Sequence, residues 1–259
     1  MAPSGRRHFH PEQQGFSPEE VTILDSATTR ATKPSWTHLV LTHLKKDLRI
    51  EWRSREAINS MLFFSLLVVV LFSMAFDPTA DTSREIAGGV LCVATLFASV
   101  SALNQAWARE IRHQVLDALR MTPSDGAALF LAKVLANFLF VSVVQLLLGP
   151  IFFIMYNLHP LGDVWLLALV IPLGTWALVA NGTFFAAISI RSRNRELLLP
   201  LILFPIFLPA LLAMVLSTKT ILTGDDSDPT LLWIKLLGGY DVIFTTVSLL
   251  LFDTVLQAE

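Results

Sequence analysis

The chain has 259 residues, of which 54% are hydrophobic and only 15% are charged, and its formal net charge at pH 7 is −2. Its mean hydropathy is +0.61. A soluble domain carries about 25% charged residues, so this composition excludes an ordinary soluble domain and predicts a membrane protein. The single cysteine, Cys92, lies in an apolar run, which excludes a disulfide framework and a thiolate metal cage.

The first 35 residues are polar and rich in Pro, Ser, Thr and Glu, without the apolar core of a signal peptide. We expect residues 1–35 to form a disordered cytoplasmic tail.

Residues 36–56 are predicted to form an amphipathic helix at the membrane surface. Trp36, Val40, Leu44, Leu48 and Trp52 recur every four residues. Tryptophans and lysine-rich helix faces suit the cytoplasmic headgroup layer, so the lipid bilayer is one expected partner of this helix. An ordinary juxtamembrane basic segment is the alternative. The basic side chains of the opposite face are Lys45, Lys46, Arg49 and Arg53.

Two acidic residues, Asp47 and Glu51, fall on the apolar side of this helix. We expect them to face either a protein partner or the charged loop at 109–120.

Six apolar runs follow, and each has about the 20 residues that a helix needs to cross a bilayer. Backbone groups in lipid must bond within their own segment, so the runs are expected to be helices, and the fold class all-α. Together they are expected to form a six-helix transmembrane domain over residues 57–255. The predicted spans are 57–76, 86–106, about 130–156, about 164–190, 197–218 and about 231–252.

Lysine and arginine concentrate in alternate loops, which predicts the orientation. The N-terminal cluster, the 109–120 loop and the 191–195 loop are rich in them, whereas the loops at 77–85, 157–163 and 219–230 hold only Arg84 and Lys219. Both termini of this multi-pass protein are therefore expected on the cytoplasmic side.

The segment from Trp107 to Lys133 is the longest charged stretch between two spans. Ile111, Val115, Leu116 and Leu119 recur at helical spacing among charged residues, which predicts a cytoplasmic amphipathic helix that ends at Thr122-Pro123. Such a helix can dock a partner; a solvated helix lying on lipid headgroups is the alternative.

Motifs for catalysis, for nucleotide binding and for metal binding are missing from the sequence. It has no G-x-x-x-x-G-K-[ST], no H-E-x-x-H and no Cys/His cluster, so we expect neither an enzyme nor a metal site. His159 precedes a proline in a predicted outer loop, where an ordinary loop residue is favoured over a metal or heme ligand. We expect no nucleic-acid partner.

Polar residues inside spans are costly and are therefore candidates for function or helix pairing. Asp241 has the highest free-energy cost of insertion into a span. We expect its side chain to form a structural hydrogen bond, and a role in a substrate or proton path is the alternative. The full set is Asn104, Asn137, Gln145, Asn181 and Asp241.

Several motifs occur together in a fixed order. R-x-E-W-R-x-R precedes the first span, W-x-R-E, L-D-x-L-x-x-T-P and L-x-x-A-K lie between spans two and three, and P-L-x-L-F-P-x-F-x-P and L-L-x-x-Y-D-V-I-F follow. In these motifs, residues 36–255 resemble the heme exporter protein B family (CcmB).

The resemblance implies an ABC-2-like permease subunit of an exporter for heme in cytochrome c biogenesis, in the inner membrane. Its partners would be a separate P-loop ATPase and heme-handling membrane subunits. Heme would be a ligand of the complex, with no cofactor assigned to this chain. The resemblance also implies a coupling helix between spans two and three, where Gln114 stands in the place of a usual glycine. The residues expected to dock the ATPase are Glu110, Arg112, Leu116, Asp117, Leu119, Arg120 and Pro123.

Two other functions remain open at this point: an ABC-2-type permease for a lipid or polysaccharide, and a membrane scaffold that assembles other proteins without transport.

Overall fold

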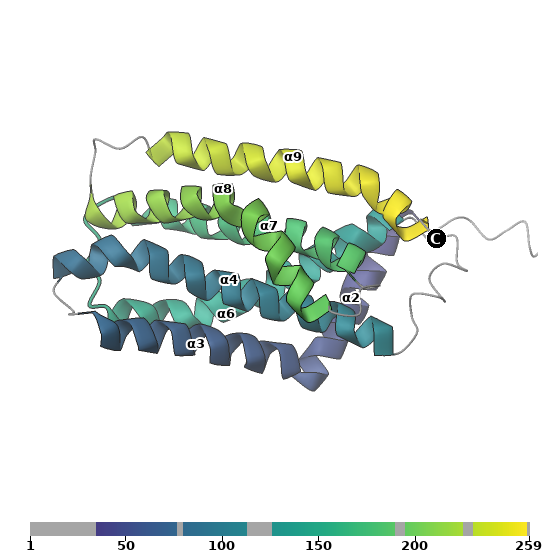
Figure 1. Ribbon diagram of the computed structural model, residues 1–259, viewed down its shortest axis with the longest axis horizontal. Coiled ribbons are helices and arrows are strands. Elements are labelled where there is room, and N and C mark those ends of the chain that lie inside the picture. The colour runs from purple at the N-terminus through teal and green to yellow at the C-terminus, as the bar shows by residue number, and fades with distance from the viewer. Residues whose placement is uncertain (1–34, 77–79, 113–125, 190–194, 225–229, 258–259) are drawn as a thin grey trace, which may run out of the picture. The chain divides into compact units, whose positions relative to one another are not determined.

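The structure is a computed structural model that describes residues 35–76, 80–112, 126–189, 195–224 and 230–257. Side chains at 80–81, 107–112, 195–198, 253 and 256–257 are not described. The regular elements in these ranges are all helical (Figure 1), which confirms the predicted fold class. The helices are α2 (Trp36–Ser54), α3 (Glu56–Ala75), α4 (Ala80–Arg112), α6 (Gly126–Met155), the short 3₁₀ helix η2 (Val164–Leu166), α7 (Leu167–Ser189), α8 (Arg195–Thr223) and α9 (Thr230–Gln257).

Six of these helices are long and apolar enough to cross a membrane, which confirms the predicted number of spans. Each predicted span overlaps its helix and differs from it by a few residues at the ends. The candidate spans are Glu56–Ala75, Thr82–Ala106, Gly126–Met155, Val164–Ser189, Leu199–Thr223 and Thr230–Phe252.

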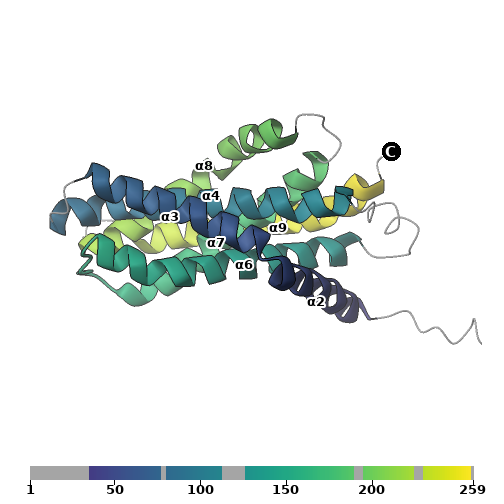
Figure 2. The same ribbon diagram turned by 90° about the horizontal axis from the view of Figure 1, so that it is seen from below.

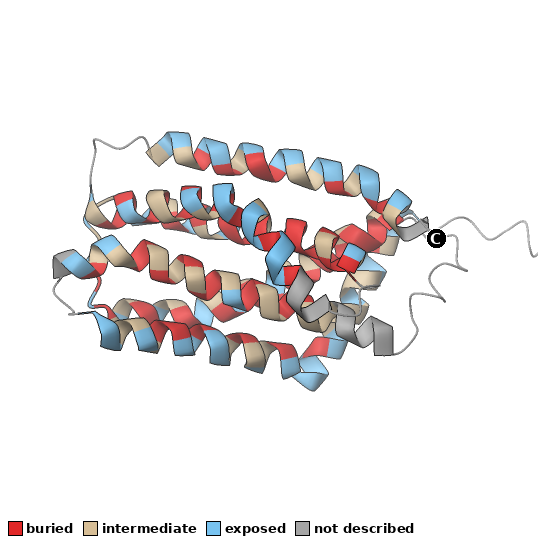
Figure 3. Ribbon diagram, viewed as in Figure 1, coloured by how far each residue is buried: buried red, intermediate tan, exposed pale blue. Residues whose placement is uncertain are grey.

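The spanning helices run alongside one another, and α2 leaves the bundle at one end (Figure 2). α4 contacts α3, α6, α7 and α8, whereas α9 contacts α6, α7 and α8. Buried positions lie on the helix faces that meet, and exposed ones follow the outer sides of α3 and α9 (Figure 3). Those outer sides carry large apolar residues, including Phe63 at 62%, Met74 at 83% and Val242 at 68% exposure. An apolar outer surface around a bundle is what a lipid environment requires.

The second span continues further than expected. α4 is one helix from Ala80 to Arg112, so its backbone extends beyond the predicted span end at 106. Residues 109–112, at the start of the predicted coupling helix, therefore belong to α4. The rest of that predicted helix lies within 113–125, outside the described residues.

The helix expected at 36–56 is observed as α2, which ends at Ser54. Arg55 follows with φ 54° and ψ 8°, in the left-handed region, and α3 begins at Glu56. Because this conformation interrupts the helix, the chain changes direction between α2 and the first span.

Prolines occur inside three of the spans. Pro150 lies in α6, Pro172 in α7, and α8 carries three prolines. Figures 1 and 2 show the first part of α8 angled away from the rest of that helix. A proline removes a backbone donor and crowds the preceding turn, which accounts for the bend.

The close approach of α4 to α8 depends on Gly88. A Cβ atom at this position would lie 2.8 Å from the carbonyl oxygen of Val215 and 3.2 Å from the backbone nitrogen of Lys219. We expect Gly88→Ala to lower the free energy of unfolding by about 1–3 kcal/mol, because a helix backbone cannot move aside as a flexible side chain can. Thermal unfolding of the protein purified in detergent would measure the change.

The neighbouring glycine is the control. A Cβ at Gly89 would meet no heavy atom within 4 Å, so Gly89→Ala should leave the unfolding temperature unchanged or raise it. Equal effects of the two substitutions would contradict this account of the α4–α8 contact.

Candidate functional site

The junction of α2 and α3 is built around Glu51, whose side chain is fully buried. Its Oε1 accepts hydrogen bonds from the backbone N–H of Ala57 at 2.9 Å and of Ile58 at 3.3 Å. The first N–H groups of a helix have no partner within the helix, and the helix N-terminus favours negative charge. Glu51 therefore caps the first membrane span from the preceding helix.

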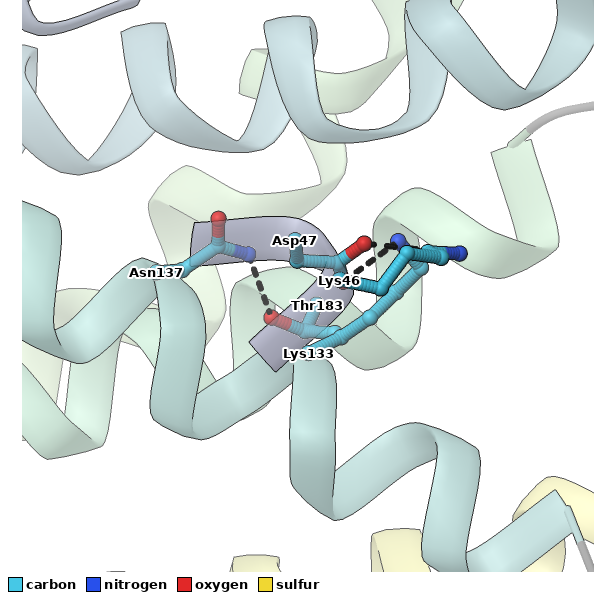
Figure 4. A network of polar contacts seen from close by, with 5 residues as sticks. All are labelled: Lys46, Asp47, Lys133, Asn137 and Thr183. Atoms are coloured by element: carbon cyan, nitrogen blue, oxygen red, sulfur yellow. Dashed lines mark hydrogen bonds and ion pairs between the residues drawn. The ribbon is translucent and has the colours of Figure 1, made fainter. Parts of the chain in front are cut away.

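A second acidic residue of α2, Asp47, pairs with the third span. Asp47 Oδ2 lies 3.5 Å from Lys133 Nζ, and Asp47 Oδ1 lies 3.4 Å from Lys46 Nζ (Figure 4). The Lys133 side chain is 3% exposed and that of Asp47 is 17% exposed. The contacts described here for Asp47 and Glu51 thus lie within the chain itself, at α2, α6 and α3.

One turn further along α6, a hydrogen bond leads to the fourth span. Asn137 Nδ2 donates to Thr183 Oγ1 of α7 at 3.4 Å, and both residues are buried (Figure 4). Lys133 and Asn137 are one turn apart on α6, so the Asp47–Lys133 pair and the Asn137–Thr183 bond together connect α2, α6 and α7. We call these four residues the polar line.

A third predicted polar residue, Gln145, connects three spans. Its Nε2 donates to Thr175 Oγ1 on α7 at 2.8 Å and to Thr95 Oγ1 on α4 at 3.1 Å. The Thr175 hydroxyl lies 3.0 Å from Gln145 Oε1 and donates to the carbonyl of Ile171 at 2.8 Å. Bonds of this kind hold helices together where no water can substitute.

Asn181 connects the last three spans through a tyrosine. Its Nδ2 donates to the carbonyl of Ala177 at 2.8 Å and lies 3.3 Å from the Tyr240 hydroxyl. That hydroxyl donates to the carbonyl of Ile206 on α8 at 2.8 Å. Asn104, the remaining amide of the predicted set, is half-buried on α4.

Asp241 is placed differently from the other intramembrane polar residues. It is only 7% exposed, yet neither carboxylate oxygen has a hydrogen-bond partner within the described part of the chain. Lys235, on the same helix, is exposed. The expected structural hydrogen bond of Asp241 is therefore not found within the described part of the chain.

The predicted interfacial residues of α2 fall mainly on its exposed side. Trp36 is 42% and Trp52 is 70% exposed, while Val40 is buried and Leu44 packs against the bundle. Trp52 thus lies outside the stripe that packs against the bundle, and its expected place in the headgroup layer stays a prediction. Of the predicted basic residues, Lys45, Arg49 and Arg53 are exposed and Lys46 is half-buried.

The structure leaves the predicted ATPase-docking residues undescribed. Glu110 and Arg112 lie on the final turns of α4, where side chains are not described. The others, Leu116, Asp117, Leu119, Arg120 and Pro123, lie outside the described residues. Their role in docking stays a prediction.

Within the described ranges, no group of three His, Cys, Asp or Glu side chains is placed to hold a metal ion. His159 is exposed in the loop after α6, with Nδ1 3.0 Å from the carbonyl oxygen of Asn157. Its own carbonyl accepts a hydrogen bond from Arg84 Nε at 2.9 Å, so its backbone ties this loop to α4.

Comparison with known proteins identifies the family of this chain. The CcmB protein family matches residues 38–257, which include every helix from α3 to α9 and nearly all of α2. This chain belongs to the CcmB family. Membership makes it the membrane subunit of a transporter rather than an enzyme, as the absence of a nucleotide-binding motif predicted.

Curated relatives agree with the family. Heme exporter protein B of Pseudomonas aeruginosa is 28% identical over 206 residues, which cover 80% of this chain and 92% of that protein. The proteins of the same name from Rhodobacter capsulatus and Paracoccus denitrificans are each 31% identical over 169 residues, covering 65% of this chain and 77% of theirs. The predicted resemblance to heme exporter protein B is therefore confirmed.

Proposed function

We propose that this chain is the permease subunit of an ABC-type exporter that handles heme during cytochrome c maturation. The observation that carries the proposal is the match of residues 38–257 to the CcmB family, whose curated relatives are named for heme export. The chain lacks a P-loop, so a separate ATPase subunit supplies the energy. Heme-handling membrane subunits complete the complex, and this chain itself needs no bound cofactor.

The distribution of positive charge supports a cytoplasmic position for both termini in the inner membrane. In that orientation, α2, the C-terminal end of α4 and the N-terminal end of α6 all lie at the cytoplasmic face. The segment 109–123, which comprises the last residues of α4 and most of the connection to α6, is the site at which the ATPase docks.

The polar line gives a route for the motion that the ATPase drives. Lys133 lies two turns into α6, close after the docking segment, and pairs with Asp47 of α2. Asn137 then connects the same part of α6 to Thr183 of α7. A displacement of the docking segment therefore moves α6 together with α2 and α7. The ATPase shifts the permease between two states only if it binds them with different affinities.

Affinity purification from gently solubilised membranes tests the docking site. We expect a P-loop ATPase to co-purify with the tagged chain and to be lost from Asp117→Arg, because reversal of a docking charge opposes the partner's complementary surface. Glu110→Arg should have the same effect, and both variants should fail to mature cytochrome c.

The matched control is Asp163→Arg, a charge reversal at an exposed residue in the loop before η2, at the other end of the bundle. This variant should retain the ATPase. Recovery of the wild-type chain without any nucleotide-binding partner would contradict the proposed function. Retention of the ATPase by both docking variants would contradict the docking site alone.

A further inference from the structure

An apolar groove of about 460 Å³ lies between α6 and α7. Its lining includes residues near the end of α6 and the start of α7, and these ends of the two helices are remote from α2 (Figure 2). Leu146, Gly149 and Pro150 of α6 line one side, and Ala168 and Pro172 of α7 line the other. Thr218 and Leu222 of α8, both buried, lie at its base. The volume is within the usual range of small-molecule sites, about 300–1,000 Å³.

Several residues of α6 and α7 that line the groove are small or have a restricted backbone. Larger side chains at these positions would fill the space between the two helices. A Cβ atom at Gly149 would meet no heavy atom within 4 Å. Pro150 and Pro172 lie within the two helices, where prolines disturb regular helix packing. The groove is therefore a property of the spans themselves and does not depend on a loop.

The groove opens sideways, at the level of the membrane. Leu146, Pro150, Ala168 and Pro172 are exposed, and all four lie within candidate spans. In a bilayer these positions face hydrocarbon, so a lipid chain reaches the groove without crossing water. Trp165, 84% exposed in η2 just before Ala168, suits the headgroup level and indicates that the groove begins close below it.

The polar groups of the groove are few. The Gln145 amide is bonded to Thr95 and Thr175. The Thr218 hydroxyl, in contrast, is 1% exposed and has no hydrogen-bond partner in the described part of the chain. An unpartnered hydroxyl in an apolar site costs about 1–3 kcal/mol, which an acceptor on a bound molecule removes. The site thus offers a long apolar surface and one buried donor.

A tetrapyrrole does not suit this lining. Heme iron is held in proteins by His, Cys, Met or Tyr, and none of these is among the residues that line the groove. No Lys or Arg lines it to pair with carboxylates.

We propose that this groove binds one acyl chain of a membrane phospholipid, with the Thr218 hydroxyl donating a hydrogen bond to an ester carbonyl. The bound lipid separates α6 from α7 at this end of the bundle, while Asn137–Thr183 and Gln145–Thr175 join the same helices further along. The site requires neither heme nor the ATPase.

Photolabelling in reconstituted vesicles tests the site. The full chain is placed in phosphatidylcholine vesicles that contain a trace of phosphatidylethanolamine with a diazirine on one acyl chain, and labelled residues are identified by mass spectrometry. We expect labelling of Ala168 and Leu222 to exceed that of the lipid-facing residues Phe64 and Leu71 on α3.

Gly149→Trp should abolish this excess by filling the groove from a position where added atoms meet open space. Gly239→Trp on α9 is the matched control, because a Cβ there also meets no heavy atom within 4 Å, and it should leave the labelling unchanged. Should Gly149→Trp fail to fold, Ala168→Trp at the mouth fills the groove from the other helix, with labelling read at Leu222. Thr218→Val, which keeps the shape and removes the donor, should reduce the excess.

Two outcomes would overturn the inference. Equal labelling at the groove and at α3 would mean that ordinary surrounding lipid reaches both. Loss of the excess on addition of hemin, in the wild-type chain, would assign the groove to a tetrapyrrole instead of a lipid.

Discussion

Replacing Asp47 with leucine should release α2 from the bundle and lower the hydrogen-exchange protection of α2 amides about 100-fold. Lys133, whose side chain is 3% exposed, would lose the carboxylate that lies 3.5 Å away. Removing one partner of a buried ion pair destabilises a structure by about 3–5 kcal/mol, because the remaining charge stays in a low-dielectric environment. Hydrogen exchange measured by mass spectrometry reports this local opening even if the spans remain folded.

Two further variants distinguish the contribution of the buried Asp47–Lys133 pair from that of the more exposed Asp47–Lys46 pair. Lys46→Ala removes the other cation near Asp47, but the Lys46 side chain is 39% exposed, so the protection of α2 should change little. Lys133→Met combined with Asp47→Leu should restore most of the protection, since apolar residues of similar size can replace a buried ion pair. If Asp47→Leu alone leaves α2 fully protected, apolar contacts such as those of Val40 are sufficient to hold it.

The membrane spans could be predicted closely because the hydropathy and the length of a span are properties of one continuous stretch of sequence. A run of about 20 apolar residues has few alternatives to a spanning helix, whatever its neighbours are. The same argument located Asn137, Gln145 and Asn181, because polar residues in such runs are conspicuous in the sequence itself.

The partners of these residues could not be predicted, because they come from other helices. Periodicity places Asp47 and Glu51 on the side of α2 that faces protein, but it does not show that Lys133 and the N-terminus of α3 lie there. In the sequence, Lys133 is the last residue of both the charged segment from Trp107 and the L-x-x-A-K motif, which does not identify its partner. A lysine at the start of an apolar span is a signal that could have identified it, since such a charge needs a partner.

The four-residue pattern placed Trp52 on the same apolar face of α2 as Val40, but Val40 is buried whereas Trp52 is 70% exposed. A helix has 3.6 residues per turn, so residues spaced by four drift around its axis. Over four such steps from Trp36 to Trp52, the drift moves the last residue away from the face that contacts α6.

Replacing Asp241 with an apolar residue is expected to raise the stability of the protein and to abolish its function. Neither of its buried oxygens has a hydrogen-bond partner among the described residues, so the carboxyl group opposes folding. We expect Asp241→Leu to raise the free energy of unfolding by about 1–3 kcal/mol, because an apolar side chain of similar size removes the unsatisfied group. An ionisable residue inside a span is by default a functional candidate, so the same variant should fail to mature cytochrome c.

Asn181→Leu is the control for the stability measurement, since Asn181 is also buried but its Nδ2 is bonded to Ala177 and Tyr240, and only its Oδ1 lacks a partner in the described part of the chain. This substitution should lower the unfolding temperature in detergent, whereas Asp241→Leu should raise it. Equal losses from the two variants would mean that Asp241 has a structural partner. A stabilised Asp241→Leu chain that still matures cytochrome c would contradict the functional half of the prediction. Stabilisation with loss of maturation would mean that the carboxyl group is kept for transport at the expense of folding.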